Sequence, residues 1–524
     1  MRLLYISSIF MHNSFGEVSH KFLKMLFKYS ELDIHLYNIG QPEVNADKLM
    51  NIFTKAGSIK YIPSYNFSED SDDKFIINYM NGLFHLEKYI LEINPDIVII
   101  LYDDKTIKDY SDMIKNIKIK HSWTGLFVPY IPLEYKSPPI DIYNLECQGY
   151  ITVNNWSLKE IKNVIPSQVP IYVVPHIVSD FNKINNKCEK THISEIYEKI
   201  KNKYIIGFVN RNQSRKRLDL VIESFFLFNE NIPDSILILK TEYTTNQIYK
   251  PIDIDSLKNH NNVIIIDNYL NNQDLNALYN MFDIMINATD GEGCGLTPLE
   301  CALSGTLSIF PNHSAYKQFS KIIPNAMVSA YQVPYQYAHI TNQYTTFSQG
   351  RTHLCIYYEC EHIKELSTPM VSFQSIKSTI PTYILSKNND LNDKYGFYNN
   401  IEQLLSKINY SLELQILITS DLETIRYILH WLTNNGTIKT IFQNRHRKCI
   451  KASSLEIDCG INCSTVGIIN PQDICNKLLY YYTHKNEYNS DLEKLQEYII
   501  ENFSEKYVWN CFKTAIDGIT LSNN

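Results

Sequence analysis

The chain has 524 residues, of which 44% are hydrophobic and 20% are charged, and its formal net charge is −7. This length exceeds one ordinary hydrophobic core and predicts two large domains or more. The acidic balance excludes a general binder of polyanions, so any basic site must be local.

The first third of the chain alternates short apolar runs with helical patterns. The pattern predicts helices over 18–29 and 75–93. The runs between them are short, rich in β-branched and aromatic residues, and typical of buried strands. These predicted strands lie at 2–7, 33–38, 96–101, 149–153 and 170–175.

The same rhythm begins again at residue 204, after a polar break at about 177–202. The second series predicts strands at 204–209, 235–239, 262–266, 283–287 and 306–310, with helices near 217–229, 272–281 and 297–304. Alternating strands and helices predict parallel sheets with helices on both faces. The fold class is therefore α/β, with two doubly wound Rossmann-like domains and an insertion in the second.

The rhythm is lost from about 330 to 462, which we interpret as an insertion. Within it, 401–433 predicts helix, and N-R-H-R-K at 444–448 is a basic run of the kind that usually forms a solvated surface. The α/β pattern resumes at 466–474 and ends in helices at about 472–483, 489–502 and 505–517. The expected domains are 1–178, then 179–504 with its insertion, then 505–524.

Ligands of open α/β sheets bind beyond the carboxyl ends of the strands, so the loops that follow strands are the places to search. One such loop reads N-R-N-Q-S-R-K-R and follows the strand at 204–209. Arg211 can grip a phosphate with two hydrogen bonds, and Lys216 can act as a point charge beside it. The alternative is that Arg215, Lys216 and Arg217 begin a solvated helix, where the helix dipole disfavours cations.

A second loop, N-A-T-D-G-E-G-C-G-L-T-P-L-E, follows the strand at 283–287. Its glycines allow a close approach of the backbone to a ligand, and the helix start behind it favours an anion. Thr297 is the expected cap of that helix and Pro298 its first residue. Thr297 and Glu300 would then form a capping box, a purely structural role for Glu300 that leaves Glu292 unexplained.

These residues carry a resemblance to a known family. Glu292 and Glu300 are separated by seven residues, and E-G-C-G-L-T-P-L-E resembles the E-x7-E motif of retaining GT-B glycosyltransferases of family four. Arg211 and Lys216 have the separation of that family's donor-phosphate loop. The resemblance is strong over about 203–315 and plausible at 466–515. It is diffuse over 1–180, apart from the loop around Gly16 and P-H-I-V-S-D at 175–180.

The resemblance implies an enzyme of the hexosyltransferase type that moves a sugar from a nucleotide-sugar donor to an acceptor hydroxyl with retention of configuration. No metal and no cofactor are expected, because cations and helix amides would stabilise the leaving diphosphate. The resemblance also implies that the two domains face a cleft and that the C-terminal helix of 505–524 crosses back to the first domain, as its family counterpart does. The acceptor would be a glycan, a lipid or a protein. The implied catalytic residues are Glu292, Arg211 and Lys216, and the implied donor-binding residues are Glu300, Gly293, Cys294, Gly295, Leu296 and Gly16.

Several alternatives stay open at this stage. A catalytically inactive GT-B scaffold could bind a nucleotide sugar or a protein partner. A nucleic-acid binder is opposed by the acidic net charge. Four cysteines, Cys355, Cys360, Cys459 and Cys463, could supply four thiolates to a zinc ion, but their irregular spacing favours ordinary buried cysteines. Candidate acceptor contacts are His121, Trp123 and Glu134.

The expected location is cytoplasmic. No stretch of the sequence reaches the uninterrupted apolar length that a transmembrane helix requires. Eleven cysteines scattered over the chain do not suggest a disulfide framework, which fits a reducing compartment. Peripheral contact with a membrane stays compatible with these features.

Overall fold

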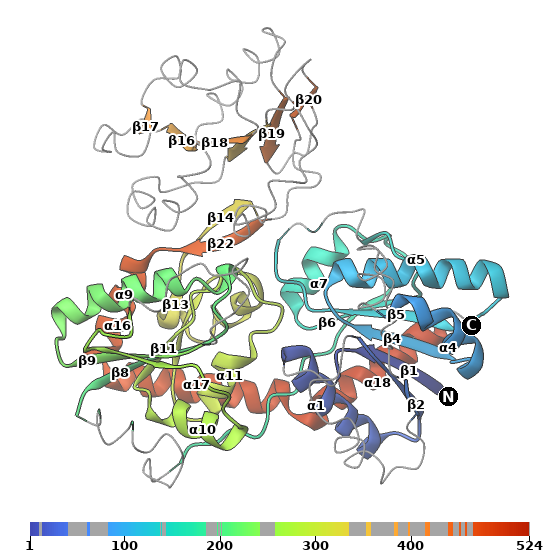
Figure 1. Cartoon of the computed structure of the whole chain (residues 1–524), viewed down its shortest axis with the longest axis horizontal. Coiled ribbons are helices and arrows are strands. Elements are labelled where there is room, and N and C mark those ends of the chain that lie inside the picture. Colours follow the sequence, from blue (N-terminus) through green and yellow to red (C-terminus); the bar gives the residue numbers. More distant parts are fainter. Residues whose placement is uncertain are drawn as a thin grey trace.

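The computed structural model of the chain shows two α/β lobes side by side (Figure 1). A further group of strands is connected to the second lobe. The structure describes residues 1–9, 13–39, 60–62, 82–136, 138, 143–184, 196, 200, 202–241, 257–334, 353–357, 382–385, 397–398, 414–419, 439–443, 450–451, 456–457 and 465–522.

The first lobe is built on a seven-stranded parallel sheet with the order β3-β2-β1-β4-β5-β6-β7. Every residue of the central strand β4, I-V-I-I-L, is buried, because helices cover both faces of the sheet. The strands are β1 (Arg2–Ser7), β2 (Asp33–Asn38), β3 (Lys60–Ile62), β4 (Ile97–Leu101), β5 (Leu126–Ile131), β6 (Tyr150–Thr152) and β7 (Ile171–Val173).

Side-chain caps set the starts of three helices in this lobe. Asn13, Asp103 and Asn154 each accept a hydrogen bond from a backbone N–H in the first turn of the helix that follows. Each helix therefore begins at a fixed point beyond a strand. The helices are α1 (Ser14–Tyr29), α4 (Leu83–Ile93), α5 (Asp104–His121) and α7 (Asn155–Lys162).

The second lobe repeats this plan with a six-stranded sheet of order β10-β9-β8-β11-β12-β13. Helices α9 and α16 pack together on it, and α11 contacts both α10 and α17. The prediction of two doubly wound α/β units is confirmed. The strands are β8 (Tyr204–Val209), β9 (Ser235–Lys240), β10 (Val263–Ile266), β11 (Ile284–Ile286), β12 (Ser308–Pro311) and β13 (Met327–Val328); the helices are α9 (Leu218–Asn231), α10 (Asn272–Met281), α11 (Leu296–Leu303), α16 (Pro471–Thr483) and α17 (Lys485–Phe503).

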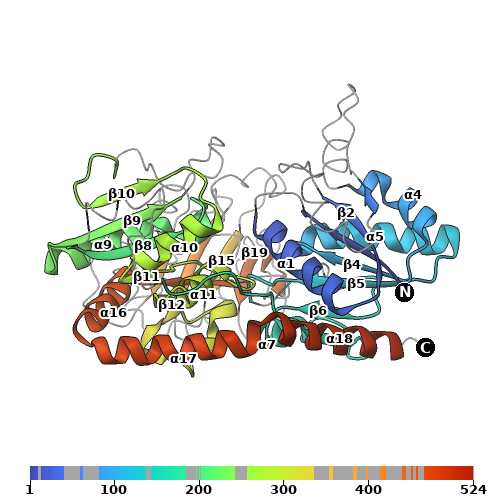
Figure 2. The same ribbon diagram turned by 90° about the horizontal axis from the view of Figure 1, so that it is seen from below.

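The last helix, α18 (Glu505–Leu521), lies on the first lobe (Figure 2). The chain leaves α17 at Ser504, whose side chain caps α18, and Phe512 then packs edge-on against Phe22 of α1 with ring centroids 5.1 Å apart. The chain passes between the lobes twice: in the outgoing crossing after β7 and in the returning crossing between α17 and α18. The two crossings lie side by side, because Val178 N–H donates to Phe503 O over 3.1 Å. The domain limits at residues 178 and 504 stay predictions.

The insertion is joined to the second lobe by an antiparallel pair, β14 (Ala330–Pro334) and β22 (Thr465–Ile469). Its strands correct two expectations. Five of them form a parallel sheet of order β17-β16-β18-β15-β19, so a strand pattern does continue past 330. Residues 414–419 are strand β18 rather than part of a helix over 401–433. The strands are β15 (His353–Tyr357), β16 (Thr382–Leu385), β17 (Phe397–Tyr398), β18 (Leu414–Thr419) and β19 (Lys439–Gln443), with a separate pair β20 (Ile450–Lys451) and β21 (Glu456–Ile457).

Two features singled out in the sequence of the insertion fall outside the described residues. These are the basic run at 444–448 and three of the four cysteines considered for zinc, Cys360, Cys459 and Cys463. Within the described part of the chain, no group of three or more His, Cys, Asp or Glu side chains is arranged to hold a metal ion.

Candidate functional site

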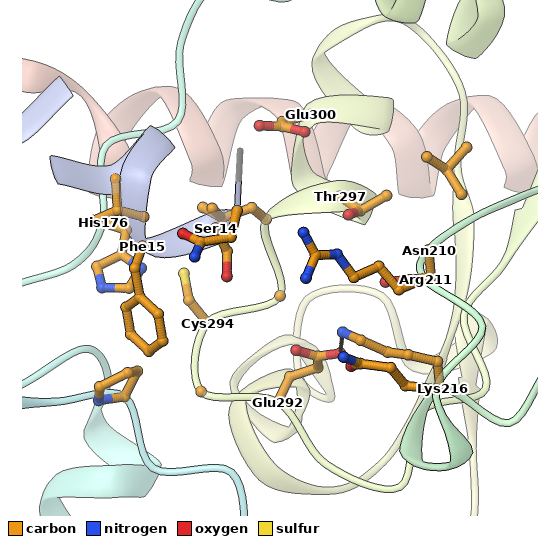
Figure 3. A pocket seen from close by; sticks show the side chains of 18 of the residues that line it. Ser14, Phe15, His176, Asn210, Arg211, Lys216, Glu292, Cys294, Thr297 and Glu300 are labelled. Atoms are coloured by element: carbon orange, nitrogen blue, oxygen red, sulfur yellow. Dashed lines mark hydrogen bonds and ion pairs between the residues drawn. The ribbon is translucent and has the colours of Figure 1, made fainter. Parts of the chain in front are cut away.

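A cavity of about 510 Å³ opens between the two lobes, at the carboxyl ends of their strands. The first lobe contributes the start of α1 and the loop after β5. The second lobe contributes the loop after β8 and the glycine-rich loop before α11 (Figure 3). Residues at the end of β9 and after β10 line the cavity as well. Of the nine residues predicted from the sequence, eight line this cavity: Arg211, Lys216, Glu292, Gly293, Cys294, Gly295, Leu296 and Glu300.

The ninth residue, Gly16, is not among the lining residues. It lies in the first turn of α1, where its N–H donates to the capping Asn13 Oδ1 over 2.8 Å. Its three neighbours Asn13, Ser14 and Phe15 line the cavity instead. The turn that contains Gly16 thus lies at the cavity, although Gly16 itself does not line it.

The loop after β8 turns back on itself before α9 begins. Ser214–Lys216 form a 3-10 turn, and Arg217 follows in the left-handed region with φ 50° as the residue before α9. The alternative that Arg215, Lys216 and Arg217 begin a solvated helix is wrong, because α9 starts at Leu218 and Lys216 and Arg217 are nearly buried.

Arg217 has a structural role that differs from that of its neighbours. Its guanidinium pairs with Asp219 at 2.6 Å and with the fully buried Asp290 at 3.2 Å. This pairing fastens the loop after β8 to the loop after β11. The two basic residues before it, Arg215 and Lys216, line the cavity.

The glycine-rich loop passes very close to the first lobe. A Cβ on Gly293 would lie 2.6 Å from Pro132, and the Gly293 carbonyl accepts a 2.7 Å hydrogen bond from Asn154 Nδ2. Gly295 has φ +73°, and a side chain there would collide with Tyr316. Both positions therefore require glycine, one for space and one for backbone conformation as well.

The helix behind this loop begins earlier than the sequence predicted. Gly295 is the residue before α11, Leu296 is its first residue, and Thr297 and Pro298 are its second and third. The expected capping box is wrong, because Thr297 lies inside the helix and no side chain caps it. Glu300 consequently has no capping role to explain its position.

Four charged side chains meet at the floor of the cavity. Glu292 Oε1 pairs with both Lys216 Nζ and Arg215 Nη1, the latter at 3.2 Å. Arg215 Nη2 also reaches across the cleft to Glu134 Oε1, 3.0 Å away, in the loop after β5. The cluster therefore joins the two lobes through an alternating series of acidic and basic groups.

The electrostatics of this cluster follow from its burial. The Glu292 side chain is only 9% exposed, and burial alone would raise its pKa, but Lys216 and Arg215 outweigh that effect and lower the pKa to about 2. Burial, reinforced by Arg215, lowers the pKa of Lys216, and Glu292 opposes this. Burial raises the pKa of Glu134, with Arg215 opposing and Glu292 reinforcing the rise. Glu292 is thus ionised at every physiological pH.

Glu300 lies higher in the cavity, on α11. Its carboxylate accepts a long 3.5 Å hydrogen bond from Tyr279 and lies 3.9 Å from Lys21 Nζ of the first lobe. Burial raises the pKa of Glu300, and Lys21 opposes the rise. The carboxylate therefore retains acceptor capacity on the cavity side.

The structure adds residues that the sequence alone did not single out. Lys240, the last residue of β9, and Thr241, which follows it, line the cavity, and Tyr269 stands at its edge with 68% of its surface exposed. Thr241 Oγ1 is buried and has no hydrogen-bond partner among the described residues. The rule that ligands lie beyond strand ends could have found Lys240 and Thr241, whereas nothing in the local sequence marks Tyr269.

Only one of the three candidate acceptor contacts lies at the cavity. Glu134 lines it, as described above. His121 ends α5 and pairs with Glu87 on the surface, 2.6 Å away. Trp123 is buried and donates its indole N–H to Pro95 O over 3.1 Å, so it belongs to the core of the first lobe.

Comparisons with known proteins bear on the family and on the fold. Residues 189–321 match the family model of glycosyl transferases group 1. The match includes β8 to β12, the loops that carry Arg211, Lys216 and Glu292, and α11 with Glu300. No curated protein matches the chain.

Solved structures identify the fold as GT-B. The α,α-trehalose 6-phosphate synthase of Burkholderia multivorans is 7% identical, with all of both chains covered and a TM-score of 0.53. Anabaena Alr3699/HepE in complex with UDP-glucose is 8% identical, with 99% of this chain and 100% of that chain covered and a TM-score of 0.50. At such identities the likeness concerns the fold alone. No helix in the described ranges has the length and apolar character needed to cross a bilayer.

Proposed function

We propose that this GT-B protein is a retaining glycosyltransferase of the hexosyltransferase type that uses a nucleotide-sugar donor. The observation that carries the proposal is the convergence of Arg211, Lys216, Glu292, Glu300 and the start of α11 on one cavity between the lobes. Two cations and a helix N-terminus beside two carboxylates suit a molecule with a diphosphate and many hydroxyl groups.

The diphosphate would lie between Arg211, Lys216 and the amides of residues 293–296. As the glycosidic bond breaks, negative charge grows on the leaving phosphate, and preorganised cations and amide dipoles stabilise it more strongly than water does. Lys216 already stands in a fixed position through its pair with Glu292, so it needs little rearrangement to meet a phosphate. This arrangement requires no metal and no cofactor.

The carboxylates would bind the neutral parts of the donor. Glu292, ionised and fixed by two cations, would accept hydrogen bonds from hydroxyls of the transferred sugar. Glu300 would accept those of the ribose, with Cys294 and Leu296 between the two. The exposed ring of Tyr269 offers a stacking surface for the base at the cavity edge.

The acceptor would enter from the side of the first lobe, where Glu134 faces the cavity. Its hydroxyl oxygen forms the new bond to the anomeric carbon on the face from which the diphosphate leaves, and its proton passes to the leaving phosphate. Attack on that face retains the anomeric configuration. The acceptor is a glycan, a lipid or a protein, and assays with each class identify which one is used.

The test is a screen of nucleotide sugars by thermal shift and by release of nucleoside diphosphate. UDP-glucose comes first, because the structural neighbour Alr3699/HepE binds it. We expect a raised melting temperature, release of the diphosphate without added metal and in the presence of a chelator, and a product whose anomeric configuration by NMR equals that of the donor. Binding without any release across acceptors would favour an inactive scaffold, and inversion would refute retention.

A further inference from the structure

Lys21 of α1 connects three elements at the boundary between the lobes. Its Nζ lies 3.4 Å from Ser179 O and 3.9 Å from Asp180 Oδ2, both in the segment that follows β7. It lies 3.9 Å from Glu300 Oε1 on α11 of the other lobe. The Lys21 side chain is only 11% exposed, so these partners hold it in a nearly dry position.

The place of Lys21 in α1 is set by the crossings between the lobes. Asp180 is held in the left-handed region, with φ 71°, within the outgoing crossing. Two turns further along α1, Lys28 pairs with Glu505 at the returning crossing. One face of α1 thus carries two lysines that contact the crossings, and of these two only Lys21 lies beside Glu300, which lines the cavity.

The ionised form of Glu300 depends on a nearby cation more than that of an exposed carboxylate does, because water stabilises its charge less. Its side chain is 14% exposed, and an uncompensated buried charge is costly. The charged and titratable groups that face it are Lys21 and Glu17 from α1, Asp180 from the crossing, Tyr279 from α10, and Cys294 and Cys301 from its own loop and helix. Lys21 is the cation of this set, and it belongs to the opposite lobe.

We infer that Lys21 is a positioning residue of the donor site, which supplies from the first lobe the positive charge that keeps Glu300 ionised to receive the ribose hydroxyls. The inference rests on the proposed function, because it takes Glu300 as a ligand of the donor. It assigns to α1 a part in nucleotide affinity although Lys21 itself need not touch the nucleotide.

The experiment compares Lys21→Met with its matched control Lys28→Met. Both remove one lysine from the same face of α1, and only the first removes the partner of Glu300. Kd for UDP is measured by calorimetry from about pH 6 to about pH 8.5. Without Lys21 the pKa of Glu300 rises further, so at low pH the carboxyl is protonated and Kd should increase about tenfold over the unmodified protein.

The sign of the pH dependence separates this role from a structural one. The ratio of the two Kd values cancels the titration of UDP itself, and it should fall toward one as rising pH ionises Glu300 again. Lys21→Arg should restore the affinity, and Lys21→Met should add nothing in a Glu300→Gln background. A ratio that is constant with pH, or an equal effect of Lys28→Met, would overturn the inference.

The outcome for the unmodified protein distinguishes this inference from the proposed function. If the unmodified protein binds neither UDP nor another nucleoside diphosphate, the proposed function fails and the inference fails with it. If it binds and Lys21→Met binds equally well at low pH, the inference alone fails.

Discussion

Replacing Lys216 and Arg211 separately by Met should have different effects on stability but similar effects on catalysis. Lys216 is 12% exposed and pairs with the buried Glu292, whereas Arg211 is exposed at the edge of the cavity. The pKa of Glu292 is about 2, against an ordinary value of 4.5. At about 1.36 kcal/mol per pKa unit, its surroundings favour the ionised carboxylate by about 3 kcal/mol.

Lys216 and Arg215 share that stabilisation, so Lys216→Met should lower the free energy of unfolding by about 1–3 kcal/mol at pH 7. Arg211→Met should change it by less than about 0.5 kcal/mol, as is usual for an exposed position. Both variants should lose about 2–4 kcal/mol of transition-state stabilisation in kcat/KM for the donor. Urea denaturation and a diphosphate-release assay measure the two quantities.

The pH dependence gives an independent check of the same reasoning. Because the pKa of Glu292 is depressed in the folded state, its contribution is fully present above about pH 4.5 and is lost as the pH falls toward 2. The stability difference between Lys216→Met and the unmodified protein should therefore shrink over that interval. Equal stability losses in the two variants, or a difference that persists at low pH, would refute this account of the cluster.

Three further predictions concern the carboxylates and the glycine loop. Glu300→Gln should raise KM for the nucleotide sugar without lowering the melting temperature, because no capping box is lost; unchanged kinetics would remove Glu300 from the donor site. Gly295→Ala should destabilise the fold by about 1–3 kcal/mol, since φ +73° and contact with Tyr316 both exclude a Cβ. Thermal melting would show this loss of stability, and an unchanged melting temperature would contradict the geometry. Glu134→Gln weakens the ion pair with Arg215 across the cleft. We expect KM for the acceptor to rise while nucleotide affinity, measured by calorimetry, stays within about threefold. A selective loss of nucleotide affinity would show that Glu134 contacts the donor instead.

Much of the fold was determined by local sequence. The buried run Ile97–Leu101 and the strand that ends at Val209 are apolar over the length of a strand, and the helical pattern near 217–229 follows the second of them. Such patterns depend on neighbouring residues alone. Because parallel strands place their carboxyl ends at one edge of a sheet, the loops with Arg211 and Glu292 could be assigned to the site before any contact was known.

The tertiary structure decided which charges meet and where α11 begins. Glu292 pairs with Lys216, 76 residues earlier in the chain, and Arg215 with Glu134 of the other lobe. No periodicity encodes such pairs, because they depend on how the two lobes approach. The start of α11 at Leu296 likewise follows from the space that Tyr316 leaves beside Gly295, which outweighs the local preference for a cap at Thr297. Local sequence therefore placed the strands and loops, and the packing of the lobes assembled their charged side chains into one site.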